Sequence, residues 1–161
     1  MRQLLKVKNI KMIEMKNITL LLAIIFLSIG LTVKAQTEAQ KVELCSKSAG
    51  AEATYVKDLV ADLQAVQGNE KIPNAKYSLI LQKDTKYRIT ICTDDDSPGK
   101  GYVQLFDNQT MLGSSYNATT GKEFRGFDFD CQKTGVYHFF IQFQEGKAGK
   151  AVVILSFVKK L

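Results

Sequence analysis

Apolar and polar residues alternate along most of the chain after residue 75. Tyr77, Leu79 and Leu81 occupy every second position of one segment, and Tyr87, Ile89 and Ile91 do so in the next. This period of two is typical of a β-strand with one buried face, and the β-branched and aromatic residues that fill these segments pack well on a pleated surface. The pattern predicts strands at 76–82, 86–92, 101–107, 124–131, 135–143 and 151–158.

Residues typical of turns separate these segments. The sequence KDT, residues 83–85, predicts a hairpin between the first two strands. A hairpin turn at QKTG, residues 132–135, would place His138 opposite Phe129. The segment 108–121 reads as a long loop with room for one short strand around 111–116.

Residues 53–66 are ambiguous between helix and strand. Val56, Leu59, Val60 and Leu63 share one face of a helix, whereas the alternation that starts at Tyr55 fits a strand poorly. Periodicity by itself therefore favours a helix here.

The first 35 residues have the features of a signal peptide. An apolar stretch at 18–33 follows a basic run and leads to Val33-Lys34-Ala35, which predicts cleavage after Ala35 and a mature chain that begins at Gln36. The stretch is shorter than the roughly 20 residues that span a bilayer, so contact with the membrane is expected only through the signal peptide before cleavage. Met15 opens a compact signal peptide on its own, and residues 1–14 then read as an upstream start extension.

Three segments follow from this reading: the signal peptide at 1–35, a polar N-terminal segment at 36–52, and one folded domain at 53–161. Export would place the mature protein in the periplasm, on the cell surface or outside the cell. Residues 1–35 hold six of the 22 basic side chains and one of the 16 acidic ones, so the mature chain is nearly neutral. The basic patch that nucleic-acid binding needs is therefore not predicted.

Export also makes the three cysteines informative, because disulfides persist in oxidising compartments. Cys92 and Cys131 each close a predicted strand, where the backbone is rigid, whereas Cys45 lies in the polar segment. We predict a disulfide between Cys92 and Cys131, with Cys45 free or paired between chains. A buried thiol is the alternative for each cysteine.

The only histidine raises the question of catalysis. His138 shares a strand face with Val136, Phe140 and Gln142, and Cys131 lies seven residues before it. Nucleophilic catalysis also needs a group that orients the base and donors for an oxyanion, and the sequence indicates neither. A small hydrolase that uses Cys131 and His138 is a remote hypothesis, and a structural or ligand-facing role for His138 is preferred.

Asp94, Asp95 and Asp96 lie in the turn-rich segment TDDDSPGKG, and carboxylate oxygens are the ligands that calcium prefers. Consecutive aspartates splay apart, and the alternating spacing of an EF-hand loop is absent. A solvated turn is the main expectation, with calcium as the one possible cofactor.

The order of segments KYRITIC, GYVQLFDN, LGSSYN, FRGFDFDC, KTGVYHFFIQF and GKAVVILSF resembles the pre-peptidase C-terminal (PPC) domain and similar small exported bacterial β-sandwiches. Leu105, Asp107, Thr134, Gly135 and Tyr137 carry most of the resemblance, which spans about residues 76–158. The Gly135-x-Tyr137 step also resembles the tyrosine corner of immunoglobulin-like domains, in which a phenol reaches back to the backbone.

The resemblance implies an all-β fold, a jelly-roll-like or immunoglobulin-like β-sandwich of seven to eight antiparallel strands preceded by the signal-peptide helix, and it favours a strand at 53–66. It also implies a non-catalytic role. We therefore expect a secreted or periplasmic binding module whose partner is a protein or, as the alternative, a glycan of the cell envelope. Tyr102, Tyr116 and His138 are the candidate ligand-facing residues.

Overall fold

The computed structural model describes residues 37–68 and 70–161. The predicted signal peptide, its cleavage site and Gln36 lie outside the described residues. In the described part of the chain, no helix has the length and apolar character needed to cross a membrane.

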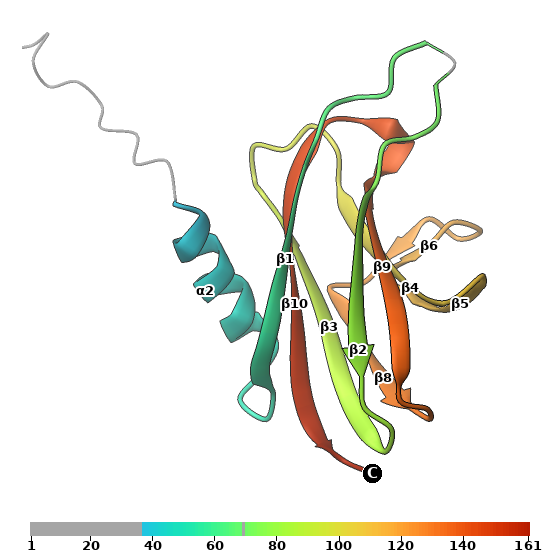
Figure 1. The fold of residues 1–161 in the computed structure, drawn as a ribbon. Helices are drawn as coiled ribbons and strands as arrows, with labels where there is room; N and C mark the ends of the chain where they lie inside the picture. The colour runs from blue at the N-terminus through green and yellow to red at the C-terminus, as the bar shows by residue number, and fades with distance from the viewer. Residues whose placement is uncertain (1–36, 69) are drawn as a thin grey trace, which may run out of the picture. The chain divides into compact units, whose positions relative to one another are not determined.

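Two four-stranded antiparallel sheets face each other (Figure 1). Sheet A has the strand order β1-β10-β3-β8, and sheet B has the order β2-β9-β4-β5. The bounds of the strands are Thr54–Leu63 (β1), Ala75–Leu81 (β2), Thr85–Thr93 (β3), Gly101–Asp107 (β4), Thr110–Ser114 (β5), Tyr116–Asn117 (β6), Lys122–Glu123 (β7), Gly126–Cys131 (β8), Gly135–Phe143 (β9) and Gly149–Lys160 (β10). The predicted all-β sandwich is confirmed.

The connections between strands give the sandwich its topology. Within sheets A and B, β4 and β5 are the one consecutive pair that stays in the same sheet, joined by a tight turn in which Asn108 has a φ of 52°. Every other connection between their strands crosses from one sheet to the other. This is the arrangement of an eight-stranded jelly roll, so the jelly-roll alternative fits the chain better than the immunoglobulin-like one.

The hairpin predicted at KDT is therefore wrong, and the hairpin at QKTG that would pair His138 with Phe129 does not form either. β2 and β3 belong to opposite sheets, as do β8 and β9, and the turns KDT and QKTG bridge the two layers. Leu81 and Thr85, on either side of the first turn, are both buried. A short turn between two alternating segments looks the same in sequence whether the chain pairs with itself or crosses the core, and this ambiguity caused the error.

The core lies between the two sheets and is built from their inward-facing side chains. Phe139, Ile141 and Phe143 of β9 are fully buried against residues such as Ile89 and Val153 of sheet A. Tyr137 lies in the same row, and its hydroxyl donates a 2.7 Å hydrogen bond to the carbonyl of Lys133. This contact confirms the predicted tyrosine corner. Burial raises the pKa of Tyr137 to about 12.

Residues 54–63 form strand β1, as the resemblance favoured and periodicity did not. Leu59, Ala61 and Leu63 face the core, while Val60 packs in a second apolar cluster on the outer face of sheet A. A register irregularity between Tyr55 and Lys57 interrupts the alternation further. A strand that is buried on both faces loses the period of two, which explains why the pattern resembled a helix.

The outer apolar cluster exists because a helix covers it. Helix α2, Glu38–Ser48, packs on β10 and β3, with Val42 and Cys45 against Val152 and Ile154. Composition alone indicates only a polar segment at 36–52. The helix begins with a capping box, in which the Thr37 side chain accepts from the Gln40 backbone and the Gln40 side chain accepts from the Thr37 backbone. This T-x-x-Q signature was visible in the sequence.

The helix also changes the disulfide. Cys45 pairs with Cys92, and Cys131 is a buried free cysteine, so the predicted Cys92–Cys131 disulfide is wrong. Cys92 and Cys131 lie on opposite faces of sheet A: Cys92 packs in the cluster beneath α2, whereas Cys131 is in the core between the sheets. The Cys45–Cys92 disulfide joins residues 47 positions apart. In the chain-entropy model, a link over this separation raises the free energy of unfolding by about 4 kcal/mol.

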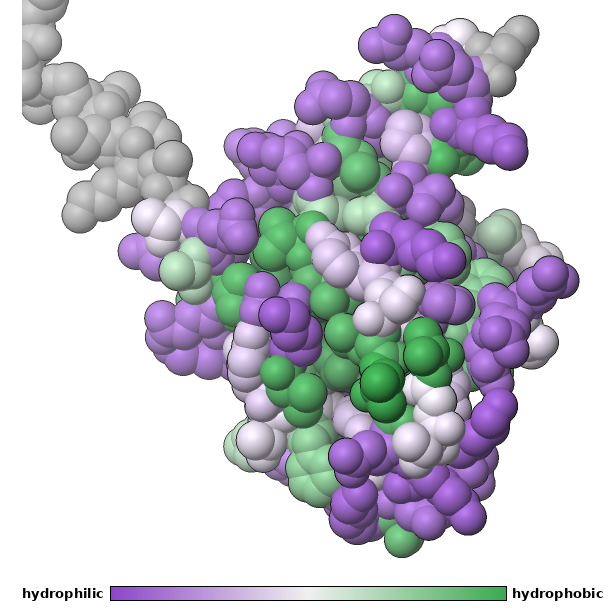
Figure 2. All heavy atoms as spheres, viewed as in Figure 1, coloured by the Kyte–Doolittle hydropathy of each residue, from purple (hydrophilic) through white to green (hydrophobic). Residues whose placement is uncertain are grey.

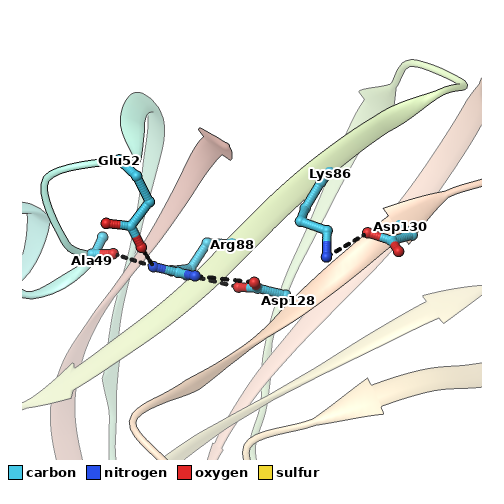
Figure 3. A network of polar contacts seen from close by, with 6 residues as sticks. All are labelled: Ala49, Glu52, Lys86, Arg88, Asp128 and Asp130. Carbon is cyan, nitrogen blue, oxygen red and sulfur yellow. Dashed lines mark hydrogen bonds and ion pairs between the residues drawn. The ribbon is translucent and has the colours of Figure 1, made fainter. Parts of the chain in front are cut away.

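Arg88 ties the end of α2 to two strands of sheet A (Figure 3). Its Nε and Nη2 donate to the two carboxylate oxygens of Asp128 on β8 at 2.7 and 3.0 Å, and its Nη1 donates to the carbonyl of Ala49 at 2.8 Å and to Glu52. The Arg88 guanidinium holds the pKa of the Asp128 carboxyl below its usual range. A second ion pair, Lys86 with Asp130, lies beside it at 3.2 Å.

The disulfide assignment predicts the reactivity of each thiol. In the folded, non-reduced mature protein, no cysteine should be alkylated, because Cys131 is 0% exposed and the other two are linked. Denaturation without reductant should expose one thiol, and reduction should expose all three. Intact mass after alkylation measures the number, and a non-reducing peptide map identifies the bridge. A peptide that links Cys92 to Cys131 would contradict the structure.

The Arg88 network predicts a stability change that depends on pH. Arg88→Ala should lower the free energy of unfolding at pH 7 by about 1–2 kcal/mol: partly exposed ion pairs contribute little, but the carbonyl of the buried Ala49 loses a donor. Because the folded-state pKa of Asp128 is lowered, its contribution is present above the unfolded-state pKa of about 4 and is lost as pH falls through the folded-state value. The difference between the variant and the wild type should therefore shrink as pH falls from about 5 to below the unfolded-state pKa of about 4.

Urea unfolding across that pH range measures both effects. Lys147→Ala is the matched control, because it removes a cation from an exposed pair with Glu145 and should change stability by less than about 0.5 kcal/mol. An Arg88→Ala difference that stays constant with pH would mean that the Asp128 pair does not contribute.

Candidate functional site

The outer face of sheet B is the most distinctive surface of the described structure. In β9, the side chains of Tyr137, Phe139, Ile141 and Phe143 point into the core, so those between them point outward. The same alternation holds in β2 and β4. We name this surface the open face; it comprises Lys76, Ser78, Ile80, Tyr102, Gln104, Phe106, Met111, Val136, His138, Phe140 and Gln142.

Strand register arranges the open face in rows that cross the sheet. Ile80 lies beside Val136 at one end. The next row runs from Ser78 through His138 and Phe106 to Met111, and the row after it from Lys76 through Phe140 to Gln104. Tyr102 and Gln142 form the last row. Apolar and aromatic side chains thus run through successive rows, and hydrogen-bonding groups lie between them.

Contacts within the open face hold several of these side chains in place. The rings of Phe106 and Phe140 meet edge to face with their centres 5.3 Å apart, and the Lys76 ammonium lies 5.5 Å from the centre of the Phe140 ring. The Tyr102 hydroxyl donates to the side-chain carbonyl of Gln142 at 2.5 Å. A surface ordered in this way loses little conformational freedom when it binds.

Solvent exposure of apolar residues is high at the margins of this face. Ile80 is 72% exposed, Met111 53% and Val136 49%. Figure 2 shows hydrophobic residues at the surface over β2. Single exposed apolar residues are common, but Ile80 and Val136 are direct strand neighbours, and Phe106 and Phe140 lie in the two rows that follow. A surface on which apolar residues recur in successive rows is typical of binding sites.

Sheet A differs from sheet B in this respect. Helix α2 covers the apolar part of its outer face, and the charged network around Arg88 occupies another part. Within residues 37–68 and 70–161, α2 is the one α-helix, and it packs on β10 and β3 of sheet A. The open face of sheet B therefore has no helical cover in the described structure.

The structure places His138 near the middle of the open face. Its Nδ1 lies 2.8 Å from the Ser78 hydroxyl, and its strand neighbours are Ser78 and Phe106. Phe129, the neighbour that a hairpin would have given it, is in sheet A. The expected half-exposed position of His138 is confirmed, whereas its expected strand partner is wrong.

Tyr102 and Tyr116, the two candidate tyrosines, come together at one end of the open face. Their ring centres are 5.3 Å apart and the rings are tilted by 42°. Burial, and to a lesser degree Tyr116, raises the pKa of Tyr102. The hydroxyl of Tyr102 is therefore a stable hydrogen-bonding group at neutral pH.

Cys131 and His138 do not form a catalytic pair. The Cys131 thiol is buried in the core, where it lies 3.2 Å from the carbonyl of Lys133 and 3.6 Å from the Tyr137 hydroxyl. His138 points to the outer side of sheet B. The two residues are on opposite sides of a layer of packed side chains, so the proton transfer that a thiol nucleophile needs has no path between them.

The three consecutive aspartates do not gather around one point. Asp94 pairs with Lys41 of α2, while Asp95 and Asp96 are exposed. Among the described residues, no group of three or more acidic, cysteine or histidine side chains is arranged to hold a metal ion. The segment is a turn whose first carboxylate anchors the helix.

Ile80, Phe106 and Met111 were not recognised as neighbours of His138 from the sequence. Their outward direction could be read from the alternation in 76–82 and 101–107. Their proximity to His138 could not, because it depends on β9 lying between β2 and β4. That strand order follows from the crossings between the sheets.

The sequence matches no protein-family model and no curated protein. The resemblance to PPC domains stays a prediction, and the proposals below rest on the chemistry of the described surfaces.

Proposed function

We propose that this protein is an exported, non-catalytic binding module that docks a protein of the cell envelope on the open face of sheet B. The observation that carries the proposal is the contiguous apolar surface around Ile80, Val136, Phe106 and Phe140, with Ile80 72% exposed. Leaving such a surface in water is unfavourable by about 25 cal/mol per Å² of apolar area, and a partner that covers it recovers this free energy.

The composition of the open face favours a protein over a glycan as its partner. Lys76 is its one formally charged residue, and its margin is aliphatic at Ile80, Val136 and Met111. Interfaces between proteins have centres that are poor in charge and enriched in aromatic residues and methionine. A saccharide would instead need free hydrogen-bonding groups, whereas Tyr102 and Gln142, in the last row of this face, already bond each other. A partner with an apolar centre and a carboxylate opposite Lys76 complements this face.

Two further observations support the other parts of the proposal. The disulfide between Cys45 and Cys92 favours an oxidising compartment and so agrees with export. The burial of Cys131, on the far side of the sheet from His138, favours a role without catalysis.

Charge placed in the open face should abolish docking. The double variant Ile80→Glu/Val136→Glu buries two carboxylates in the interface, and we expect the affinity for the partner to fall by about tenfold or more. The measurement is affinity capture from the organism's own envelope extract with tagged mature protein, identification of the captured protein, and titration of that purified protein against each variant.

Val56→Glu is the matched control. Val56 is 47% exposed on β1 of sheet A, so this variant places one carboxylate at a valine about as exposed as Val136 but away from the open face, and it should retain the affinity. Thermal unfolding checks that all variants fold. A captured partner that binds the double variant as tightly as the wild type would contradict the proposal, and so would repeated capture without any specific partner.

A further inference from the structure

A groove of about 600 Å³ lies apart from the centre of the open face, near the end of β3. The end of β3 with the β3–β4 loop forms one side of it, and the segment from Ser115 to Arg125, which includes the β6–β7 hairpin, contributes the other. Its volume falls in the range of about 300–1,000 Å³ that is typical of small-molecule sites. Tyr102, at one end of the open face, also lines this groove, but the four residues that carry the proposed protein docking do not.

The walls of the groove are held in place by bonds that do not involve a ligand. Cys92, which lines it, is linked to Cys45 of α2. The Thr93 hydroxyl accepts from the Gly101 backbone at 2.9 Å. On the other side, the backbone N–H of Phe124 donates to the Ser115 carbonyl at 2.9 Å. Such a pre-formed site costs little ordering free energy when it is filled.

Several charged groups in the groove already have partners. Asp94 pairs with Lys41. Glu123 accepts hydrogen bonds from Lys100 at 3.1 Å and from the Gln144 amide at 2.8 Å, which joins the β6–β7 hairpin to the loops beside it. These residues shape the groove, and their hydrogen-bonding capacity is largely used.

Two other charged side chains in the groove have no such partner, and one aromatic ring is partly exposed. Arg125 and Asp95 are exposed, and neither makes a side-chain hydrogen bond or ion pair with another described residue. The Phe124 ring is 44% exposed, and the Lys122 ammonium lies 4.9 Å from its centre. The groove thus offers a ligand the apolar ring of Phe124, the N–H donors of the Arg125 guanidinium and the acceptor oxygens of the Asp95 carboxylate.

We infer that this groove binds a neutral saccharide. A sugar ring has an apolar C–H face that can lie on Phe124, and its hydroxyls both donate and accept, so they match Asp95 and Arg125 at the same time. Anionic ligands such as phosphates fit less well, because Asp94, Asp95 and Glu123 line the groove together with its cations Lys100 and Arg125. A purely apolar ligand would leave the guanidinium and the carboxylate unpaired.

Saturation-transfer NMR and calorimetry with the mature protein test this inference. The probes are the neutral tetrasaccharides cellotetraose, chitotetraose and mannotetraose, with tetragalacturonic acid as the acidic comparison. We expect at least one neutral probe to bind, and we expect Phe124→Ala and Arg125→Gln each to weaken its binding about tenfold. Both residues are exposed, so the variants should unfold at temperatures close to that of the wild type.

The open-face variant Ile80→Glu/Val136→Glu is the matched control and should bind the saccharide as the wild type does. A fall in saccharide affinity in this variant would mean that the sugar binds on the open face, and failure of all neutral probes or binding of the acidic probe alone would overturn the inference. Binding that survives both Phe124→Ala and Arg125→Gln would overturn the site. None of these outcomes decides the capture of a protein partner, so the two proposals are tested separately.

Discussion

The packing of two sheets against each other is the constraint on which the rest of this structure depends. In each strand, alternate side chains point into the core between the two sheets, as Phe139 and Ile141 do in β9. The side chains between them must then point outward, whatever their polarity. A strand such as β10, with Val152 and Ile154 on its outer side, needs a second cover. The chain supplies that cover with α2 for sheet A, whereas none of the described helices supplies it for sheet B.

This constraint also explains what the sequence could predict and what it could not. Alternation in 76–82, 86–92 and 135–143 identified strands and their buried faces, because that pattern is a local consequence of burial. The Gly135-x-Tyr137 step identified a tyrosine corner for the same reason: the hydroxyl reaches a carbonyl only four residues away. Local patterns were less informative in β1, where Leu59 faces the core and Val60 faces α2.

Partners distant in sequence were the main source of error. The Cys92–Cys131 disulfide was inferred from two strand ends, but the side of the sheet on which each cysteine lies depends on α2, which places Cys45 against Cys92. The neighbours of His138 were likewise unpredictable, because they come from β2 and β4, which flank β9 only through the crossings between the sheets. The capping box at Thr37 and Gln40 was a local signal, and it would have revealed the helix that positions Cys45.

The same rigid frame presents two surfaces of different chemistry. The open face is mostly apolar and aromatic, and its polar groups are partly paired within the face, as Tyr102 is with Gln142 and His138 with Ser78. The groove has two charged groups without side-chain partners among the described residues and a partly exposed ring that the Lys122 ammonium contacts, and the Cys92 in its lining is held by the disulfide. An apolar face gains free energy from burial over a large area, whereas a groove with unpaired donors and acceptors gains it from a few directed hydrogen bonds. Large area suits a protein surface, and directed bonds suit a small polyhydroxylated ligand, so the two surfaces lead to two different proposals of ligand class.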